Sequence, residues 1–268
     1  MDVCELDWLD EQRGAAIDSL GTVDWVIGSD IVYDPSLARP LAETYKEFLG
    51  TGTTRAILCA AVRNSTTFGI FIEELKRVNI HAVLIEEHTV PAGRLKYCFD
   101  VTAPVRVYEL YTKIRMQRPA VKFTPMPILQ PRYEIVQFTE REKICEAAAS
   151  WSKVVSAAFG HFADSWDAAR FNELYGSSER IELLLFIRDV ESSTIVATAF
   201  AWRQEVDVGK MHWVGVRPEH RGVGLAKAMV SKILQYWAGR VATVTLSTES
   251  FRTEAIGLYE SMGFRRVE

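Results

Sequence analysis

The sequence contains few cysteines and histidines, and none of them is spaced like a ligand pair. Its four cysteines include no CxxC pair and are scattered at Cys4, Cys59, Cys98 and Cys145. Cysteines scattered in this way favour reduced thiols in a cytosolic or nuclear compartment over a disulfide framework or a zinc site. Four of the five histidines, His81, His88, His161 and His220, show no ligand spacing, so we expect no metal site.

An excess of positive charge is also missing. The net charge is −4; up to Gln130 there are 14 Lys+Arg against 17 Asp+Glu, and beyond it 17 against 18. Neither half has the charge of a nucleic-acid-binding protein. No apolar run is long enough to span a bilayer, and the N-terminus lacks a basic region followed by an apolar one. We therefore expect neither nucleic acid nor membrane as a partner, and a cytoplasmic location.

A length of 268 residues is sufficient for two modest domains. Four of the nine prolines lie between Arg115 and Pro131, where they favour an extended chain. This concentration predicts a first domain over residues 1–114, a proline-rich linker over 115–130 and a second domain over 131–268.

Strands and helices alternate in the first half. Apolar runs predict strands at 23–32, 56–62, 81–86 and 105–111, and helices at 37–49 and from Ser65, a candidate N-cap. This alternation predicts a mostly parallel, doubly wound α/β sheet. No strand–GxGxxG–helix unit precedes these elements, so we expect a truncated domain.

The second half restarts the pattern. We expect strands at 133–138, 181–187, 194–202, 210–216 and 241–247, and helices at 140–159, 166–175, from Leu225 and at 253–262. Leu225, Met229, Ile233 and Trp237 form an apolar stripe on one helix. Gly263 suits a left-handed C′ position, with Phe264 placed for the hydrophobic contact that follows such a cap.

One glycine-rich turn stands out between a predicted strand and a predicted helix. Gly222 and Gly224 allow close approach of the backbone to a ligand, and the helix that begins there leaves its first N–H groups unpaired. Such a turn suits phosphate oxygens. The plainer alternative is a simple glycine turn.

Two motifs make the second half resemble the GNAT superfamily of acyl-CoA N-acyltransferases. Residues Arg221–Ala226 match its Arg/Gln-x-x-Gly-x-Gly/Ala signature, and residues Ala255–Phe264 resemble its Ala-x-x-Leu-Tyr-Glu-x-x-Gly-Phe element. The resemblance covers about 131–268. It implies a GNAT mixed α/β domain that uses acetyl-CoA.

The resemblance also implies roles for individual residues. The backbone N–H groups of Arg221, Gly222, Val223, Gly224, Leu225 and Ala226 would hold the pyrophosphate of coenzyme A. The N–H of Val216 would polarise the thioester carbonyl, and Tyr259 would protonate the departing thiolate. The alternative for Tyr259 is an aromatic residue of the core.

The general base is less well defined. His212 lies four residues before Val216, which predicts the same strand face, and resembles the strand histidine of the arylalkylamine acetyltransferase branch. It could instead only form a hydrogen bond within the sheet. Glu205 and Asp207 are alternatives, whereas Lys210 cannot act as a base when charged.

The sequence departs from the family pattern at two places. Arg252 stands where many members carry Asn. We also expect the family's last strand, after Phe264, to be absent.

The first half resembles the seven-strand S-adenosylmethionine-dependent protein-lysine methyltransferases over about 3–113. Ser29–Tyr33 matches their Asp-x-x-Tyr element, and Leu6-Asp7-Trp8 looks like the Leu-Asp-Trp beside the adenine; Ala60–Asn64 with Phe68 and Phe71 also fits. The motif that holds methionine and ribose is missing. We therefore expect a methyltransferase remnant in which Asp30 closes a strand and Trp8 is part of the core.

These observations predict an acetyl-CoA-dependent N-acetyltransferase that acts on a primary amine, in a small molecule or a protein, by direct attack. One alternative is a protein-lysine methyltransferase whose cofactor-binding part lies outside this chain. A non-catalytic binding module is the other.

Overall fold

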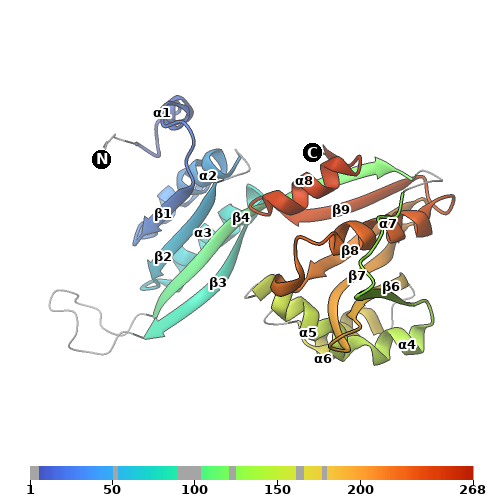
Figure 1. Ribbon diagram of the computed structural model, residues 1–268. Helices are drawn as coiled ribbons and strands as arrows, with labels where there is room; N and C mark the ends of the chain where they lie inside the picture. The colour runs from blue at the N-terminus through green and yellow to red at the C-terminus, as the bar shows by residue number, and fades with distance from the viewer. Residues whose placement is uncertain are drawn as a thin grey trace. The chain divides into compact units, whose positions relative to one another are not determined.

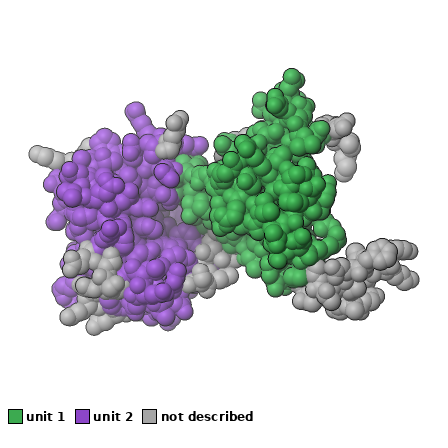
Figure 2. All heavy atoms as spheres, turned by 180° about the vertical axis from the view of Figure 1, so that it is seen from behind, with its two compact units in different colours: residues 1–114, 248–257 green, residues 115–247, 258–268 purple. Residues whose placement is uncertain are grey.

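The computed structural model describes residues 6–50, 54–89, 104–120, 125–160, 166–176 and 180–267. It divides into two compact units, which Figure 2 colours separately: unit 1 comprises residues 1–114 and 248–257, and unit 2 comprises 115–247 and 258–268. Cys59 and Cys145 are free thiols of intermediate exposure. Cys4, Cys98 and His161 lie outside the described residues.

Unit 1 is a small α/β layer (Figure 1). Its elements are α1 (Arg13–Ser19), β1 (Trp25–Ser29), η1 (Pro35–Leu37), α2 (Ala38–Leu49), β2 (Arg55–Ala61), α3 (Ser65–Arg77), β3 (Ile80–Thr89) and the first part of β4 (Pro104–Pro119). β1 and β2 are parallel, but β4 pairs antiparallel with both β2 and β3. The prediction of a mostly parallel sheet is therefore wrong, because the βα alternation does not extend to β3 and β4.

The core of unit 1 lies between its helices and the sheet. Leu41 and Tyr45 of α2 and Phe71 and Leu75 of α3 are buried, as their helical spacing predicts, and Trp8 packs against this core. Asn64, not Ser65, is the N-cap of α3. Asn64 adopts an extended conformation, so its side-chain oxygen accepts hydrogen bonds from the N–H groups at positions 66 and 67.

Unit 2 is built on an antiparallel sheet flanked by helices. Its elements are the end of β4, β5 (Tyr133–Phe138), α4 (Arg141–Glu146), α5 (Ala148–Phe159), α6 (Ala168–Phe171), the π-helical turn η3 (Asn172–Gly176), β6 (Ile181–Asp189), β7 (Thr194–Glu205), β8 (Val208–Val216), η4 (Pro218–His220), α7 (Leu225–Trp237), most of β9 (Thr243–Glu249), the end of α8 (Thr253–Ser261) and β10 (Arg265–Val267). β5, β6, β7 and β8 pair antiparallel in that order, and β9 runs parallel to β8. The single helix predicted over 140–159 is instead two helices that meet at Ala147.

Helices cover both faces of this sheet. α5 packs on β7 and β8, and α7 packs on β6, β7 and β8. A side chain at Gly215 would collide with Phe159 of α5, whereas one at Gly209 would collide with Trp237 of α7. Gly215 therefore faces α5 and Gly209 faces α7. The predicted apolar stripe of α7, from Leu225 to Trp237, is buried.

The segment after residue 114 departs from the predicted linker. β4 continues to Pro119, β10 pairs antiparallel with Arg115–Gln117, and the N–H of Ala120 donates to the carbonyl of Ala242. Pro119 is the last residue of the strand. The last strand expected to be absent is present as the short β10.

None of the helices in the described part of the chain is long and apolar enough to cross a membrane.

Candidate functional site

Two parallel strands of unit 2 separate after a short paired segment. Val208–Lys210 of β8 pairs with Thr243–Thr245 of β9, whereas the rest of β8, Met211–Val216, has no partner on β9. The backbone groups of β8 that point toward β9 are therefore left without a strand partner over this segment. Such groups are obligatory donors and acceptors, and they form an edge on which a ligand can bind.

Val216 presents its backbone to that edge. The N–H of Arg217 donates to the carbonyl of Val196 on β7 at 2.9 Å. Because successive residues of a strand alternate the side to which their polar groups point, the N–H and C=O of Val216 point away from β7. The C=O of Val216 accepts a hydrogen bond from Nε of Arg221 at 3.2 Å. The N–H of Val216 is thus directed toward the side from which β9 has separated.

A β-bulge lies in β8 between His212 and Gly215. The pairing with β7 moves from Thr198↔Gly215 to Phe200↔His212, so β8 contains one extra residue there. Trp213 has a φ of 52°, a left-handed conformation that is rare for a bulky residue.

The bulge corrects one prediction. His212 pairs with Phe200 and Val216 pairs with Ala197. Three positions separate Phe200 from Ala197 on β7, so the side chains of His212 and Val216 lie on opposite faces, not on the same face. In a strand without a bulge, two residues four positions apart have their side chains on the same face.

The glycine-rich turn precedes α7 and presents a row of backbone donors. Gly222 and Gly224 have φ values of 79° and 85°, and a Cβ at either would meet no atom within 4 Å. Among the described residues, the N–H groups of Gly222, Val223 and Gly224 donate to no protein group. The first N–H groups of α7, from Leu225, continue this row. The arrangement suits an anion such as a pyrophosphate.

Arg221 differs from the rest of the turn. Its N–H already donates to the carbonyl of Pro218 at 3.3 Å, so the row of available donors begins at Gly222. Its guanidinium donates to the carbonyl of Val216 at 3.2 Å and to that of Ala158 at 2.8 Å. The side chain therefore connects the turn to β8 and to the end of α5. Sequence reasoning missed this role, because nothing local to Arg221 shows where the side chain turns.

His220 provides a second connection that the sequence analysis missed. Its Nδ1 lies 3.1 Å from the hydroxyl of Tyr133, and the two rings meet edge to face. The first residue of β5 is thereby joined to the turn before α7.

Tyr259 lies in the last turn of α8. The N–H of Phe264 donates to its carbonyl and the N–H of Gly263 donates to that of Glu260, both at 3.0 Å. This is a Schellman motif, and its hydrophobic contact joins the rings of Tyr259 and Phe264, whose centroids are 6.0 Å apart. The predicted cap at Gly263 is confirmed. The ring of Tyr259 is 7% exposed and packs in the core, as the alternative interpretation predicted.

His212 sits among aromatic rings on the face covered by α5. Its ring stacks on Phe200 at 5.2 Å and meets Trp202 and Tyr175 edge to face at 6.3 and 6.5 Å. In the pairing of β7 with β8, His212 lies three residue pairs away from Val216, which is roughly 10 Å along the strand.

The alternative bases lie farther from Val216. Glu205 and Asp207 are exposed residues at the β7–β8 turn, where β8 begins, and Lys210 lies in the paired part of β8. Distance along the strand therefore favours His212 over these residues.

Arg252 and the residues of the methyltransferase resemblance have local partners in unit 1. Arg252 pairs with Glu249 at 2.5 Å. Asp30 donates its N–H to the carbonyl of Cys59, and its carboxylate pairs with Arg63 at 2.9 Å.

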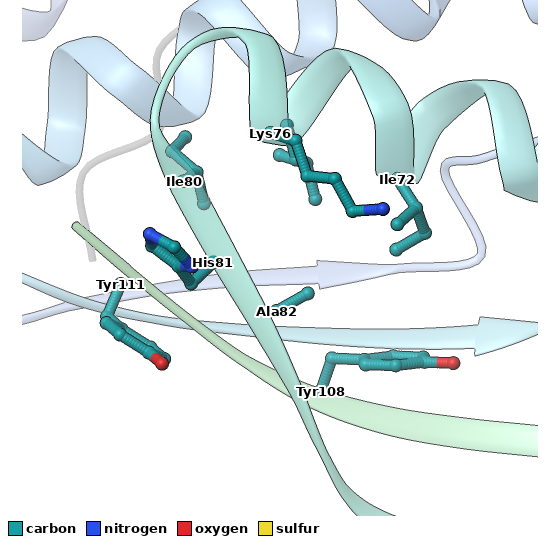
Figure 3. A pocket seen from close by; sticks show the side chains of 8 residues that line it. Ile72, Lys76, Ile80, His81, Ala82, Tyr108 and Tyr111 are labelled. Atoms are coloured by element: carbon teal, nitrogen blue, oxygen red, sulfur yellow. The ribbon is translucent and has the colours of Figure 1, made fainter. Parts of the chain in front are cut away.

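A cavity of about 260 Å³ in unit 1 contains none of the predicted site residues (Figure 3). His81 stacks on Tyr111 at one side of it, and Tyr108 lies at the other. Burial lowers the pKa of His81 and raises that of Tyr111 to about 12. Within the described residues, no group of three His, Cys, Asp or Glu side chains is arranged to hold a metal ion.

Comparison with known proteins bears on unit 2 most clearly. Residues 150–264 match the acetyltransferase (GNAT) family. A mycothiol acetyltransferase of Kineococcus radiotolerans is 36% identical over 70 residues, which are 26% of this chain and 23% of that protein. The protein-lysine N-methyltransferase EFM3 of Saccharomyces cerevisiae is 23% identical over 95 residues, which are 33% of this chain and 28% of that protein.

Among solved structures, a GCN5-related N-acetyltransferase from Sphaerobacter thermophilus is 17% identical with a TM-score of 0.49, covering 87% of this chain and 62% of its own. The chain spans about a quarter of the length of the mycothiol acetyltransferase and of the protein-lysine N-methyltransferase. The separated strands and the glycine-rich turn both lie within residues 150–264, the segment that matches the acetyltransferase (GNAT) family.

Proposed function

We propose that this protein transfers an acetyl group from acetyl-CoA to a primary amine by direct attack, without a covalent enzyme intermediate. One observation carries the proposal: the side chain of Arg221 links the turn at Gly222–Ala226 to Val216, the residue whose N–H points to the open edge of β8. To hold an acyl-CoA, a site needs a row of N–H groups that donate to the pyrophosphate and another N–H that donates to the thioester carbonyl. The match of residues 150–264 to the acetyltransferase family supports this interpretation.

The turn before α7 is proposed to hold the pyrophosphate of coenzyme A. The N–H groups of Gly222, Val223, Gly224, Leu225 and Ala226 supply donors, and the N-terminal end of the α7 dipole favours a negative charge. Gly222 and Gly224 have positive φ values and carry no Cβ. A ligand can therefore come close to the backbone N–H groups of the turn.

Val216 is proposed to hold the thioester carbonyl oxygen. Its N–H points toward the space left by β9, where an acyl group can align with the open edge of β8. A fixed N–H donor stabilises the negative charge that develops on this oxygen during attack.

Two side chains are proposed to move protons. As the amine nitrogen forms a bond to the acetyl carbon, His212 accepts the proton that the nitrogen loses, through water because of the distance of roughly 10 Å. As the carbon–sulfur bond breaks, the hydroxyl of Tyr259 supplies a proton to the departing thiolate. The products are an N-acetyl amine and coenzyme A.

The name of the mycothiol acetyltransferase relative supports acetyl transfer, but the match spans only 23% of that protein.

An assay of thiol release from acetyl-CoA over a panel of primary amines tests the proposal. We expect amine-dependent release of coenzyme A that His212→Gln lowers by about 100-fold, typical of the loss of a general base. Release that is independent of every amine, or unchanged by the substitution, would contradict the assignment.

For unit 1 we propose a methyltransferase-like layer that does not itself hold S-adenosylmethionine. The limited similarity to a protein-lysine N-methyltransferase supports the resemblance, and the parallel pair β1–β2 with α2 and α3 is compatible with it. In the described part of unit 1, no glycine-rich turn joins a strand to a helix. Titration with S-adenosylmethionine should therefore give no binding heat; saturable binding would support the methyltransferase alternative.

A further inference from the structure

The cavity of unit 1 lies between α3 and the pair of strands β3 and β4 (Figure 3). Ile72, Leu75 and Lys76 line it from α3, because residues three and four positions apart share one face of a helix. Ile80 and Ala82 line it from β3. Its volume is about 260 Å³, and a cavity of about 150 Å³ already admits benzene. The cavity therefore has room for a molecule of two fused rings.

The lining favours an uncharged ligand. Its charged side chain, Lys76, is paired within the chain, because its Nζ lies 2.6 Å from a carboxylate oxygen of Glu73 on the same helix. Ile72, Leu75 and Ile80 present aliphatic surface. A charged ligand would exchange its hydration for this surface, which is unfavourable. An uncharged and largely hydrocarbon molecule loses little hydration in the same place.

His81 adds a polar group to this apolar lining. Its ring stacks on Tyr111, with centroids 5.4 Å apart and planes inclined by 20°. Burial is the main cause that lowers the pKa of His81 below 6.5, so the imidazole is neutral at pH 7 and one of its nitrogens is an acceptor. In the part of the chain that the structure describes, the ring nitrogens of His81 have no hydrogen-bond partner. A ligand with an N–H group can therefore donate to the imidazole.

Two tyrosine rings lie on opposite sides of the cavity (Figure 3). Tyr108 packs on Phe68 of α3, with ring centroids 5.4 Å apart, and Tyr111 meets Phe251 edge to face at 5.8 Å. These contacts hold both tyrosine rings in place. Aromatic rings attract one another in offset-stacked and edge-to-face arrangements. The tyrosines therefore favour a flat aromatic ligand over an aliphatic one.

We propose that this cavity binds an uncharged, fused-ring aromatic molecule of the indole class, whose N–H donates to a ring nitrogen of His81. The aliphatic wall of α3 and the tyrosine rings cover the hydrocarbon part of the ligand, and the hydrogen bond to His81 fixes its orientation. The site lies in unit 1 and goes beyond the proposed acetyl transfer, on which it does not depend.

Ligand-observed NMR titration of the full chain with indole and with 1-methylindole, in the absence of acetyl-CoA, tests the proposal. 1-Methylindole has the same fused rings and lacks the N–H. We expect indole to bind saturably with a Kd of about 1 mM or lower, and 1-methylindole to bind about three- to tenfold more weakly, as the loss of one hydrogen bond predicts. Absence of saturation by indole, or equal affinities for the two ligands, would overturn the inference.

A substitution at His81 separates the hydrogen bond from the packing. His81→Phe keeps a ring that can stack on Tyr111 and removes both nitrogens. It should lower the affinity for indole to that for 1-methylindole, and leave the affinity for 1-methylindole nearly unchanged. A preference for indole that persists in this variant would contradict His81 as the acceptor.

Filling the cavity tests the location of the site. Ile72→Trp adds bulk to the α3 wall; Ile70→Trp is the matched control, because Ile70 lies on the same helix, is 41% exposed and is not part of the lining. We expect Ile72→Trp to lower the affinity for indole by at least about tenfold, as loss of the space for a ring requires, and Ile70→Trp to leave it unchanged. Equal affinities in two folded variants would overturn the inference. If Ile72→Trp does not fold, the comparison of indole with 1-methylindole in the wild-type chain and in His81→Phe decides.

Discussion

The guanidinium of Arg221 donates through Nε to the backbone carbonyl of Val216, at 3.2 Å. One side chain thereby fixes the distance between the turn proposed to hold a pyrophosphate and the strand residue proposed to hold a thioester. Its second bond, to the carbonyl of Ala158, anchors both to the end of α5. The proposed phosphate end and the proposed acyl end of the site are therefore connected by a group that need not touch the ligand.

Replacement of this group should weaken ligand binding indirectly. Arg221→Ala removes hydrogen bonds from a charged donor, each worth about 1.5–3 kcal/mol. We expect a lower Tm and a Kd for coenzyme A raised by about tenfold or more, measured by thermal melting and calorimetric titration. Arg188→Ala is a suitable control, because Arg188 forms an exposed ion pair with Glu134 in the same unit. Equal effects of the two substitutions on Kd would contradict the role of Arg221.

Gly224 allows the donor row to be tested apart from stability. Gly224→Ala places a Cβ in open space at a φ of 85°, at a strain cost of about 1–2 kcal/mol. Gly239, with a φ of 74° and equally open surroundings, lies beyond the other end of α7. Gly224→Ala and Gly239→Ala should lower Tm by similar amounts, but only the former should weaken coenzyme A binding. Equal affinities in the two variants would reject the turn as the binding site.

Tyr259 can be tested by removing its hydroxyl alone. Tyr259→Phe keeps the ring that packs on Phe264 and completes the cap of α8. We expect unchanged coenzyme A binding, with kcat lowered by about tenfold or more for loss of a general acid. An unchanged kcat would leave Tyr259 with the structural role alone.

An ion pair in unit 2, between the exposed Arg132 and the buried Asp189, predicts a pH-dependent stability. Arg132 holds the pKa of Asp189 below its usual range through hydrogen bonds of 3.0 and 2.7 Å to the two carboxylate oxygens. Because the folded pKa is depressed, the stabilisation is present above the unfolded pKa of about 3.9 and is lost as pH falls through the folded value. Asp189→Asn should therefore lower Tm at pH 7 and lose this difference in strongly acidic solution. A difference that does not change with pH would contradict the ion pair as its cause.

The features that the sequence predicted well are those with local physical causes. Gly263 with Phe264 forms the cap that the six residues from Tyr259 to Phe264 predict, because glycine adopts a positive φ at little steric cost. The buried stripe of α7 follows directly from helical periodicity. These signals need no knowledge of the neighbouring elements.

The features that the sequence did not reveal depend on partners distant along the chain. The bulge at Trp213 is a register shift set by β7 and by rings from α5, so the spacing of His212 and Val216 alone gave the wrong face. The prolines after Arg115 suggested a linker, but pairing with β10 extends β4 to Pro119. The direction of the Arg221 side chain likewise depends on α5, which lies some sixty residues earlier.

Calorimetric titration of the full chain with coenzyme A, and separately with pantetheine, tests the central claim most directly. Pantetheine keeps the thiol arm and lacks the pyrophosphate. If the N–H groups of Gly222–Ala226 hold that pyrophosphate, coenzyme A should bind saturably, and pantetheine should bind at least about 100-fold more weakly, the loss expected for two hydrogen bonds to a charged group. Equal affinities for the two ligands, or no binding of coenzyme A, would contradict the account.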